Sequence, residues 1–464
     1  MFRQMSKDKN KLIPELRFPE FEKEGEWEYL NGDELFEPIS NKNHNSDLPI
    51  LAITQEQGAI PREMIDYHVS VTDRSIESYK IVEEGDFIIS LRSFQGGIEY
   101  SNYIGLCSPA YIILRKKIDV VNDLYRHYFK SSPFIQDLNR NLEGIRDGKM
   151  VSYKQFSEIL IPKPQNLEQQ KIATCLSSLD ELIAAHNDKL LALKDHKKGM
   201  MQNLFPQMSE LGLDRLKDDR IKGKEILKSQ NPKNHNSDNV PNYRFPEFLK
   251  DGEWVEKKFG DVYSFKITNS FSRDKLNYNR GAVKNIHYGD IHTRFSTLFD
   301  ITNETVPYIN TDVSIDRIDQ DNYCAEGDML FADASEDLDD VGKSIEIVNL
   351  NNELLLGGLH TFLARQIVPN IILGFGGYLF KSNSIRTQIK RESQGAKVLG
   401  ISKGRISGIK ILYPTNPEEQ QKIATCLSSL DDLITAQAEK IEQLKLHKKG
   451  LMQGLFPKMS EHDF

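Results

Sequence analysis

Two long segments of the chain carry apolar residues at alternating steps of four and three positions. In the segment 165–210 these seam positions are Ile172, Leu176, Leu179, Ile183, His186, Leu190 and Leu193. In the segment 415–464 they are Ile423, Leu427, Leu430, Ile434, Gln437, Ile441 and Leu444. Such steps form the a/d seam of a heptad repeat. The pattern therefore predicts two long helices that pack along apolar stripes.

Prolines delimit both predicted helices. Pro164 and Pro417 stand just before them, and Pro206 and Pro457 stop them, since proline cannot continue a helix. About 38 residues remain for each helix, which corresponds to roughly 57 Å. Equal lengths and matched seams favour antiparallel pairing of the two helices as a spacer, with polar side chains meeting at the seam midpoint. The alternative is that both are core helices of a larger bundle.

The two helices belong to an internal repeat. The segment Glu168–Glu210 recurs as Glu419–Glu461, with roughly 31 of 43 positions identical. A second pair of matching segments, RFPEF followed by five residues and Trp, stands at Arg17–Trp27 and Arg244–Trp254. The chain is therefore a tandem duplication.

Between the matching segments lie two inserts, Glu28–Pro164 and Val255–Pro414, which share little sequence except near their C-terminal ends. Each has the size of one domain. We call the matching segments the frame. A repeated frame around two different inserts suggests shared assembly and different ligands. We expect a first insert domain with its N-terminal frame segment, a first helix, a polar linker, a second insert domain and a second helix, over 1–164, 165–210, 211–240, 241–414 and 415–464.

Both inserts show short β-branched and aromatic runs between turn residues, a pattern typical of strands. These runs are Glu83–Ser93, Ala110–Arg115, Glu326–Ser335 and Ser344–Leu350. Helical stretches are expected near Asp123–Asn141 and Gly376–Glu392. The predicted fold class is α+β, with two domains of mixed helix and strand content joined by two long antiparallel helices in a pseudo-twofold tandem repeat.

The composition is that of a globular protein, with 39% hydrophobic and 28% charged residues. The chain has no apolar run near 18 residues, and Met1–Asn10 is polar, which argues against a membrane span and a signal peptide. The four cysteines form no CxxC pair and are expected to be small core residues in a reducing, cytoplasmic compartment. They are Cys107, Cys175, Cys324 and Cys426.

No motif for catalysis is visible. The chain has no phosphate loop and no Asn-Pro-Pro-Tyr-like target-base motif. The run Leu373–Phe380 (LGFGGYLF) is better explained by helix packing than by a cofactor loop, because no acidic ribose partner follows. His287 and His292 have no third ligand at a metal-like spacing, so we interpret them as surface-loop histidines. We expect no catalytic residue and no metal site in this chain.

The net charge of −8 counts against a simple nucleic-acid binder. However, the stretch Lys381–Lys410 holds eight Lys or Arg residues and one acid. The inserts also carry polar and basic loop residues suited to base edges and phosphates. For each one alone, the alternative is a solvated surface side chain. The candidate DNA contacts are Gln55, Gln57, Arg62, Arg92, Ser93, Gln95, Arg146, Lys149 and Tyr153 in the first insert, and Arg273, Lys275, His292, Arg294, Lys343, His360, Thr361, Lys397, Ser402 and Lys403 in the second.

Taken together, the sequence resembles the specificity (S) subunit of type I restriction–modification systems. The resemblance is carried by RFPEF-x(5)-W in each half, the Gly-Asp turns before strands, the run GLHTFLAR at Gly358–Arg365, and EQQKIATCLSSLD followed by HKKG-x-M-Q-x-LF. It covers nearly the whole chain in the order of its parts. It implies that each insert is a target-recognition domain for one half of a split DNA sequence. The helices would be the spacer, and two modification (methyltransferase) subunits would dock on the frame.

The same resemblance implies that the chain is non-catalytic and holds no cofactor. S-adenosylmethionine, ATP and Mg would belong to the modification and restriction subunits, through which the complex methylates adenine and cleaves foreign double-stranded DNA in host defence. No membrane partner is expected. Two other readings remain open, namely a structural coiled-coil adaptor and a stand-alone DNA methyltransferase or nuclease. A catalytic motif in the sequence would favour the methyltransferase or nuclease.

Overall fold

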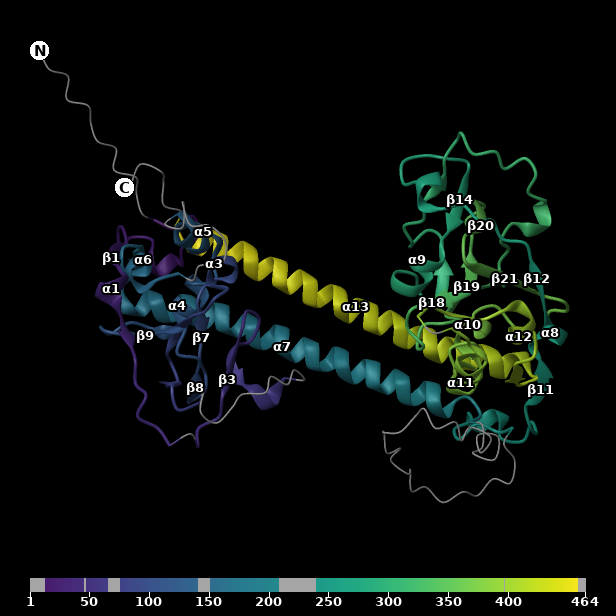
Figure 1. The fold of residues 1–464 in the computed structure, drawn as a ribbon, viewed down its shortest axis with the longest axis horizontal. Coiled ribbons are helices and arrows are strands. Elements are labelled where there is room, and N and C mark those ends of the chain that lie inside the picture. Colours follow the sequence, from purple (N-terminus) through teal and green to yellow (C-terminus); the bar gives the residue numbers. More distant parts are fainter. Residues whose placement is uncertain are drawn as a thin grey trace, which may run out of the picture. The chain divides into compact units, whose positions relative to one another are not determined.

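The computed structural model describes residues 13–45, 47–65, 76–140, 151–207, 239–395 and 397–457 (Figure 1). The described residues fall into two compact units. The first unit takes Met1–Lys189 and Gln437–Phe464, and the second takes Leu190–Ala436. Each unit therefore contains one insert and one end of both long helices. The candidate residues Arg146 and Lys149 lie outside the described residues.

The two predicted long helices are present with the expected lengths. Helix α7 spans Asn166–Asn203 (38 residues) and helix α13 spans Pro417–Leu455 (39 residues). The expectation that Pro417 precedes its helix is wrong, because it is the first helical residue. Proline fits that position, since the N–H groups of the first turn have no intrahelical acceptor and proline's φ is already helical.

Within each unit the start of one long helix packs on the end of the other. In the first unit Ile172 shares a hydrophobic cluster with Leu451 and Leu455. In the second unit Ile423 shares a cluster with Met200 and Leu204. The helix segments therefore run antiparallel in both units, as their seams predict.

The polar seam positions also meet across the helix pair. In the first unit, Gln437 Nε2 donates to the backbone oxygen of His186 at 2.8 Å and contacts His186 Nδ1 at 2.6 Å. Lys448, which continues the seam four residues after Leu444, binds Asp180. In the second unit, the equivalent Lys197 binds Asp431. The polar residues of the seam thus have partners, which fixes the register of the pairing.

The insert of the first unit is a small α+β domain whose first and last strands, β1 and β10, pair antiparallel. Its main sheet has the order β2-β9-β6-β7, and two-stranded sheets β3-β4 and β5-β8 lie beside it. The strands are β1 Glu28–Asn31, β2 Phe36–Ile39, β3 Leu51–Thr54, β4 Gly58–Pro61, β5 Lys80–Val82, β6 Phe87–Ile89, β7 Glu99–Tyr100, β8 Gly105–Cys107, β9 Ile112–Lys116 and β10 Leu160–Lys163. The helices are α1 Gly32–Leu35, α3 Ser93–Gly96, α4 Asn122–Tyr128, α5 Ser132–Arg140 and α6 Tyr153–Ser157, with 3-10 turns η1 Pro19–Phe21 and η2 Arg62–Met64.

The insert of the second unit is framed in the same way by β11 and β23. Its sheets have the orders β12-β21-β17-β19-β15, β13-β16-β14-β20 and β18-β22. The strands are β11 Val255–Lys258, β12 Tyr263–Lys266, β13 Leu276–Asn277, β14 Val283–Ile286, β15 Leu298–Asp300, β16 Tyr308–Ile309, β17 Met329–Ala332, β18 Ala334–Ser335, β19 Ser344–Asn349, β20 Leu354–Gly357, β21 Thr361–Gln366, β22 Leu399–Gly400 and β23 Lys410–Tyr413. The helices are α8 Phe259–Val262, α9 Tyr288–Thr293, α10 Phe375–Leu379, α11 Asn383–Glu392 and α12 Lys403–Ser407, with 3-10 turns η4 Pro246–Phe248, η5 Arg273–Lys275 and η6 Gln320–Asn322.

The two inserts share a core that their sequences do not reveal. The antiparallel strands β2-β9-β6-β7 have the same order as β12-β21-β17-β19. In both, the Asp of the Gly-Asp turn binds an arginine on the neighbouring strand. Arg115 Nε lies 2.7 Å from Asp86, and Arg365 Nε lies 2.8 Å from Asp328. The two inserts therefore share this part of their core although they share little sequence.

A buried ion pair ties each frame segment to its long helix. In the first unit Arg17 binds Glu168 through Nε and Nη2, both at 2.8 Å. In the second, Arg244 binds Glu419 at 2.7 and 2.6 Å. The side chains are at most 6% exposed. Bidentate guanidinium–carboxylate geometry is the strongest form of such a pair.

The next residue of each helix ties the insert to the same point. Gln169 accepts from the backbone N of Val121 and donates to the backbone oxygen of Pro164. Gln420 makes the equivalent bonds to Ile372 and Pro414. Frame, insert and helix therefore meet at one Glu-Gln pair in each unit.

The four cysteines are free, as expected from their spacing. Cys107 and Cys324 are buried, and burial raises the pKa of the Cys107 thiol to about 12. In the part of the chain that the structure describes, no helix is long and apolar enough to cross a membrane.

We predict that Glu419→Gln lowers the free energy of unfolding by about 3–5 kcal/mol, because it leaves the buried Arg244 guanidinium without its countercharge. Urea unfolding followed by tryptophan fluorescence measures the change. Glu418→Gln is the matched control, since this neighbouring side chain is exposed and its substitution should cost less than about 0.5 kcal/mol. Equal effects of the two substitutions would show that the pair does not stabilise the unit.

Candidate nucleic-acid interface

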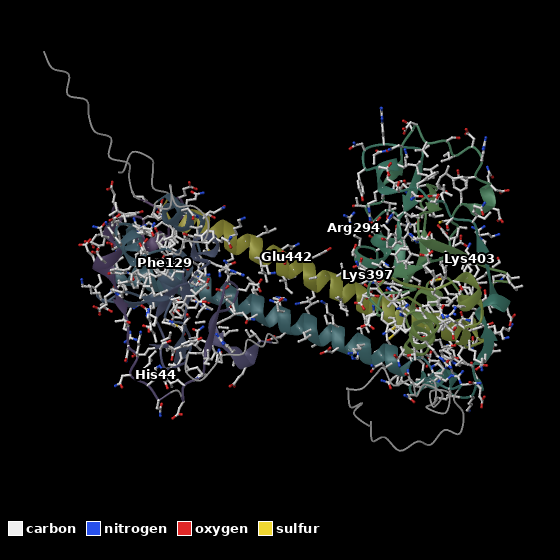
Figure 2. All side chains as sticks on the ribbon, viewed as in Figure 1. His44, Phe129, Arg294, Lys397, Lys403 and Glu442 are labelled. Carbon is white, nitrogen blue, oxygen red and sulfur yellow. The ribbon has the colours of Figure 1, made fainter. Side chains whose placement is uncertain are left out.

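In the second unit, two exposed arginines are anchored beside helix α9. Arg273 Nη2 donates to Asp290 Oδ1 at 3.0 Å, and Asp290 is 1% exposed. Arg294 Nη1 donates to the Tyr278 hydroxyl at 3.1 Å. Both guanidinium groups remain about half exposed, and Arg294 is labelled in Figure 2. A charged side chain that is anchored at one atom and exposed at the others loses less entropy when it binds a ligand.

Three histidines lie close to the ring of Tyr288, and two of them, His292 and His360, are predicted DNA contacts. Its ring centroid lies 4.6 Å from that of His287, 5.3 Å from His360 and 5.9 Å from His292. The interpretation of His287 and His292 as loop residues is wrong. His287 is the buried N-cap of α9, where its Nδ1 accepts from Gly289, and His292 lies within that helix. In the described part of the chain, no group of three or more His, Cys, Asp or Glu residues is arranged to hold a metal.

His360 is exposed and has a left-handed backbone, with φ of +54°. Its Nδ1 lies 3.1 Å from Asp333 Oδ1. A carboxylate accepts, so Nδ1 carries the hydrogen in this contact and Nε2 remains for another partner. Burial raises the pKa of Asp333, and His360 opposes that shift. A non-glycine residue in this backbone region is uncommon, and the strain is typical of functional loops.

The remaining predicted residues of the second insert divide into anchored and exposed side chains. Lys343 Nζ donates to the His292 backbone oxygen at 2.6 Å, and Lys403 Nζ lies over the rings of Phe265 and Phe362. Lys275 and Lys397 are exposed. Ser402 caps α12, and Thr361 is 3% exposed with its hydroxyl bonded to Gly358 O at 2.6 Å.

In the first unit the structure brings together four of the predicted residues. Gln55 and Gln57 are exposed in the β3–β4 turn, and Arg92 and Gln95 are exposed at helix α3. Gln55 Nε2 donates to the Arg92 backbone oxygen at 3.3 Å, which joins the two loops. Arg62 lies at the far end of the β3–β4 hairpin, half buried in η2.

Two predicted residues of the first insert serve its packing. Ser93 is fully buried, and its Oγ accepts from the backbone N of Ser90 at 2.9 Å. Tyr153 donates its hydroxyl to Phe36 O at 3.1 Å. The hydroxyls of Ser93 and Thr361 are therefore engaged within the core, which argues against direct contact with DNA.

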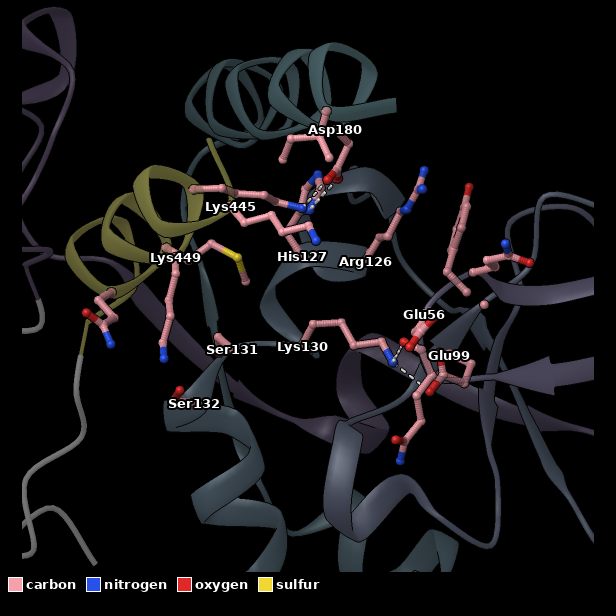
Figure 3. Close-up of a pocket in the computed structure, with 18 of the residues that line it drawn as sticks. Glu56, Glu99, Arg126, His127, Lys130, Ser131, Ser132, Asp180, Lys445 and Lys449 are labelled. Atoms are coloured by element: carbon pink, nitrogen blue, oxygen red, sulfur yellow. Dashed lines mark hydrogen bonds and ion pairs between the residues drawn. The ribbon is translucent and has the colours of Figure 1, made fainter. Parts of the chain in front are cut away.

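The β3–β4 turn forms one wall of a cleft of about 630 Å³ in the first unit (Figure 3). Strand β7, helix α4 with the segment after it, and parts of α7 and α13 supply the other walls. Cations that the sequence analysis did not select line this cleft. They are Arg126, Lys130, Lys445, Lys448 and Lys449. The repeated HKKG motif was a signal for Lys448 and Lys449, whereas no sequence signal marks Arg126.

Two ionisable side chains of the cleft do not add free charge: Lys130 forms an ion pair, and His127 is neutral. Lys130 Nζ lies 2.6 Å from Glu99 Oε1; burial raises the pKa of Glu99 and lowers that of Lys130. Burial also lowers the pKa of His127 to about 4, so that this ring is neutral at pH 7. The acid Asp180 binds Lys448.

Comparisons with known proteins agree with this architecture. The family described as Type I restriction modification DNA specificity domain matches residues 26–195 and again 251–446. The type I restriction enzyme MjaVIII specificity subunit of Methanocaldococcus jannaschii is 25% identical over 487 residues, which cover 97% of this chain and 95% of the relative. The putative MjaX specificity subunit of the same organism is 23% identical over 307 residues, which cover 65% of this chain and 59% of the relative.

A solved structure has the same fold. The type I restriction–modification system S subunit from M. genitalium superimposes with a TM-score of 0.51 at 13% sequence identity. The superposition covers 97% of this chain and 100% of the other.

We predict that Ser93→Ala destabilises the first unit by about 1–3 kcal/mol, because the buried Ser90 N–H loses its acceptor, while the DNA sequence bound stays the same. Gln95→Ala is the control from the same short helix, since Gln95 is exposed and should change stability by less than about 0.5 kcal/mol. Urea unfolding measures both variants. An unchanged stability of Ser93→Ala, together with altered target choice, would restore Ser93 as a DNA contact.

Proposed function

We propose that each insert of this chain, which belongs to the type I restriction–modification DNA specificity family, reads one part of a bipartite DNA target. The segments that repeat around the inserts dock the modification subunits. The observation that carries this proposal is the duplication of one frame around two inserts. The paired strands at the two ends of each insert, the Glu-Gln pair and the helix ends repeat in both units. The inserts differ in the sheets that they add to their shared strands and in the side chains of their exposed loops.

The exposed side chains of the two inserts suit different base patterns. In the first insert Gln55 and Gln57 come together with Arg92, and glutamine amides pair with adenine N6 and N7. In the second insert Arg273 and Arg294 dominate, and guanidinium groups pair with guanine O6 and N7. Which of these residues touch bases stays a prediction, as do the contacts proposed for the lysines.

We further propose that this chain is non-catalytic and that its partners supply the chemistry. S-adenosylmethionine would be held by the modification subunits, and ATP and Mg by the restriction subunits. The proposal is supported by the family membership. The chain's own residues would position the complex on its DNA target.

Exchange of one insert tests the two-reader proposal. We predict that replacing Glu28–Pro164 by the insert of another family member changes one half of the recognised sequence, because the other half is read by the second unit. Single-molecule sequencing of methylated bases in cells gives the target. The reciprocal exchange of Val255–Pro414 is the matched control and should change the other half. A change in both halves, or in neither, after the first exchange would contradict the proposal.

Lengthening the helices tests their proposed role as a spacer. We predict that inserting seven residues into both α7 and α13 lengthens the unread gap of the target by about three base pairs, since a heptad adds about 10 Å and DNA rises about 3.4 Å per base pair. The two ends of the target should stay unchanged. A heptad inserted into α7 alone is the control, and it should destabilise the protein because it separates His186 from Gln437. An unchanged gap with both helices lengthened would rule out the spacer role.

A further inference from the structure

The cleft of the first unit contains cations that none of the described residues neutralises. Of its lining groups, Lys130 is paired with Glu99 and Lys448 with Asp180. Among the described residues, Arg126 and Lys449 have neither an ion-pair nor a hydrogen-bond partner. The exposed Glu56 is the remaining acid of the lining. The cleft therefore presents two such cations, one from α4 and one from α13.

Arg126 is partly desolvated, which strengthens its attraction for an anion. It is half buried, and its guanidinium carbon lies 5.4 Å from the centre of the Tyr100 ring. Stacking on an aromatic ring holds the guanidinium in place and leaves its N–H groups free to donate. Lys449 faces the same cleft from helix α13 (Figure 3).

Neutral donors complete the lining and point to the class of ligand. The side-chain amides of Gln55, Gln57 and Asn102 and the hydroxyl of Ser132 line the same cleft. A guanidinium, an ammonium group and amide donors together suit the oxygens of a phosphate ester. A volume of about 630 Å³ is large enough for one nucleotide or a short stretch of backbone.

The second unit lacks the arginine of this cleft. The sequence FKS at 129–131 recurs at 380–382, so the counterpart of Arg126 is Gly377. A Cβ atom on Gly377 would lie 2.9 Å from Leu298 Cδ2 and 3.1 Å from Thr297 O. Strand β15 fills the space there, and an arginine does not fit. Arg126 is therefore specific to the first insert, whereas Lys448 and Lys449 belong to the repeated HKKG motif of the long helices.

We propose that this cleft binds phosphate groups, with Arg126 from α4 and Lys449 from α13 as the charged ligands. The phosphate ester comes either from the backbone of bound DNA or from a free nucleotide. In the first case the inference rests on the proposed function, because it adds a backbone contact to the reading of the target. The contact is made by the first unit alone.

The test compares three single variants and one double variant of the full chain. Arg126→Gln, Lys449→Ala and their combination remove the proposed ligands. Lys440→Ala is the matched control, because Lys440 is exposed on the same helix and, at nine residues' distance, lies on the opposite face from Lys449. Thermal melting verifies folding, and Lys449→Ala alone remains informative if the Arg126 variant does not fold.

Two binding measurements distinguish the sources of phosphate. Fluorescence anisotropy follows a labelled duplex that carries the target found by methylation mapping, and a scrambled duplex, over a series of salt concentrations. If DNA is the source, the slope of log affinity against log salt becomes less steep by about one for each cation removed, equally for both duplexes. If a free nucleotide is the source, calorimetry shows ATP binding to the wild type that is at least ten-fold weaker in the double variant, with the salt slope unchanged.

Either result supports the inference, and unchanged duplex and ATP binding in all ligand variants overturns it. A wild type that does not distinguish target from scrambled duplex refutes the proposed function. In that event a changed salt slope or a lost ATP affinity still supports the phosphate site, so the two failures are separable.

Discussion

The bidentate pair between the frame arginine and the first-turn glutamate of each long helix is the contact on which the architecture depends. Arg17–Glu168 and Arg244–Glu419 are almost fully buried. Burial of an ion pair contributes little net stability, but removing one partner is costly because the other charge is stranded. The pair therefore works as a constraint. It requires that the frame segment and the helix start come together, and the adjacent glutamine then binds the insert at the same point.

Polar pairs along the seam of the long helices constrain the structure in the same way. Its polar positions are each satisfied by a partner from the other helix: His186 by Gln437, Lys448 by Asp180 and Lys197 by Asp431. In a parallel arrangement or a shifted register these polar groups would face apolar neighbours, and an unpaired polar group in such a position is costly. The apolar residues supply the burial, and the polar ones select one arrangement.

Sequence reasoning predicted the parts of this molecule that depend on local periodicity. The heptad pattern predicted the antiparallel pairing of α7 and α13, and the flanking prolines predicted their length, apart from the place of Pro417. Sequence reasoning could not show that the inserts share a core, because the Asp86–Arg115 and Asp328–Arg365 pairs join residues far apart in divergent sequences. Nor could it find the cleft, since Arg126 and Lys449 come together only after folding. Ser93 was selected for its polarity, whereas its burial depends on how α3 packs.

The acidic net charge of the chain is compatible with local cationic surfaces because many of its acids orient cations. Asp290 holds Arg273 at the surface, and the Gly-Asp turn residues Asp86 and Asp328 hold arginines within the sheets. An arginine held by a buried carboxylate keeps the remaining N–H groups in fixed directions, which favours specific geometry over general attraction. Arg126 and Lys449 differ in having no such acid among the residues that the structure describes, so their charge is available to an anion. Anchored arginines are thus suited to discriminating between ligands, and unpaired cations are suited to attracting anions. The net charge of the chain reports neither property.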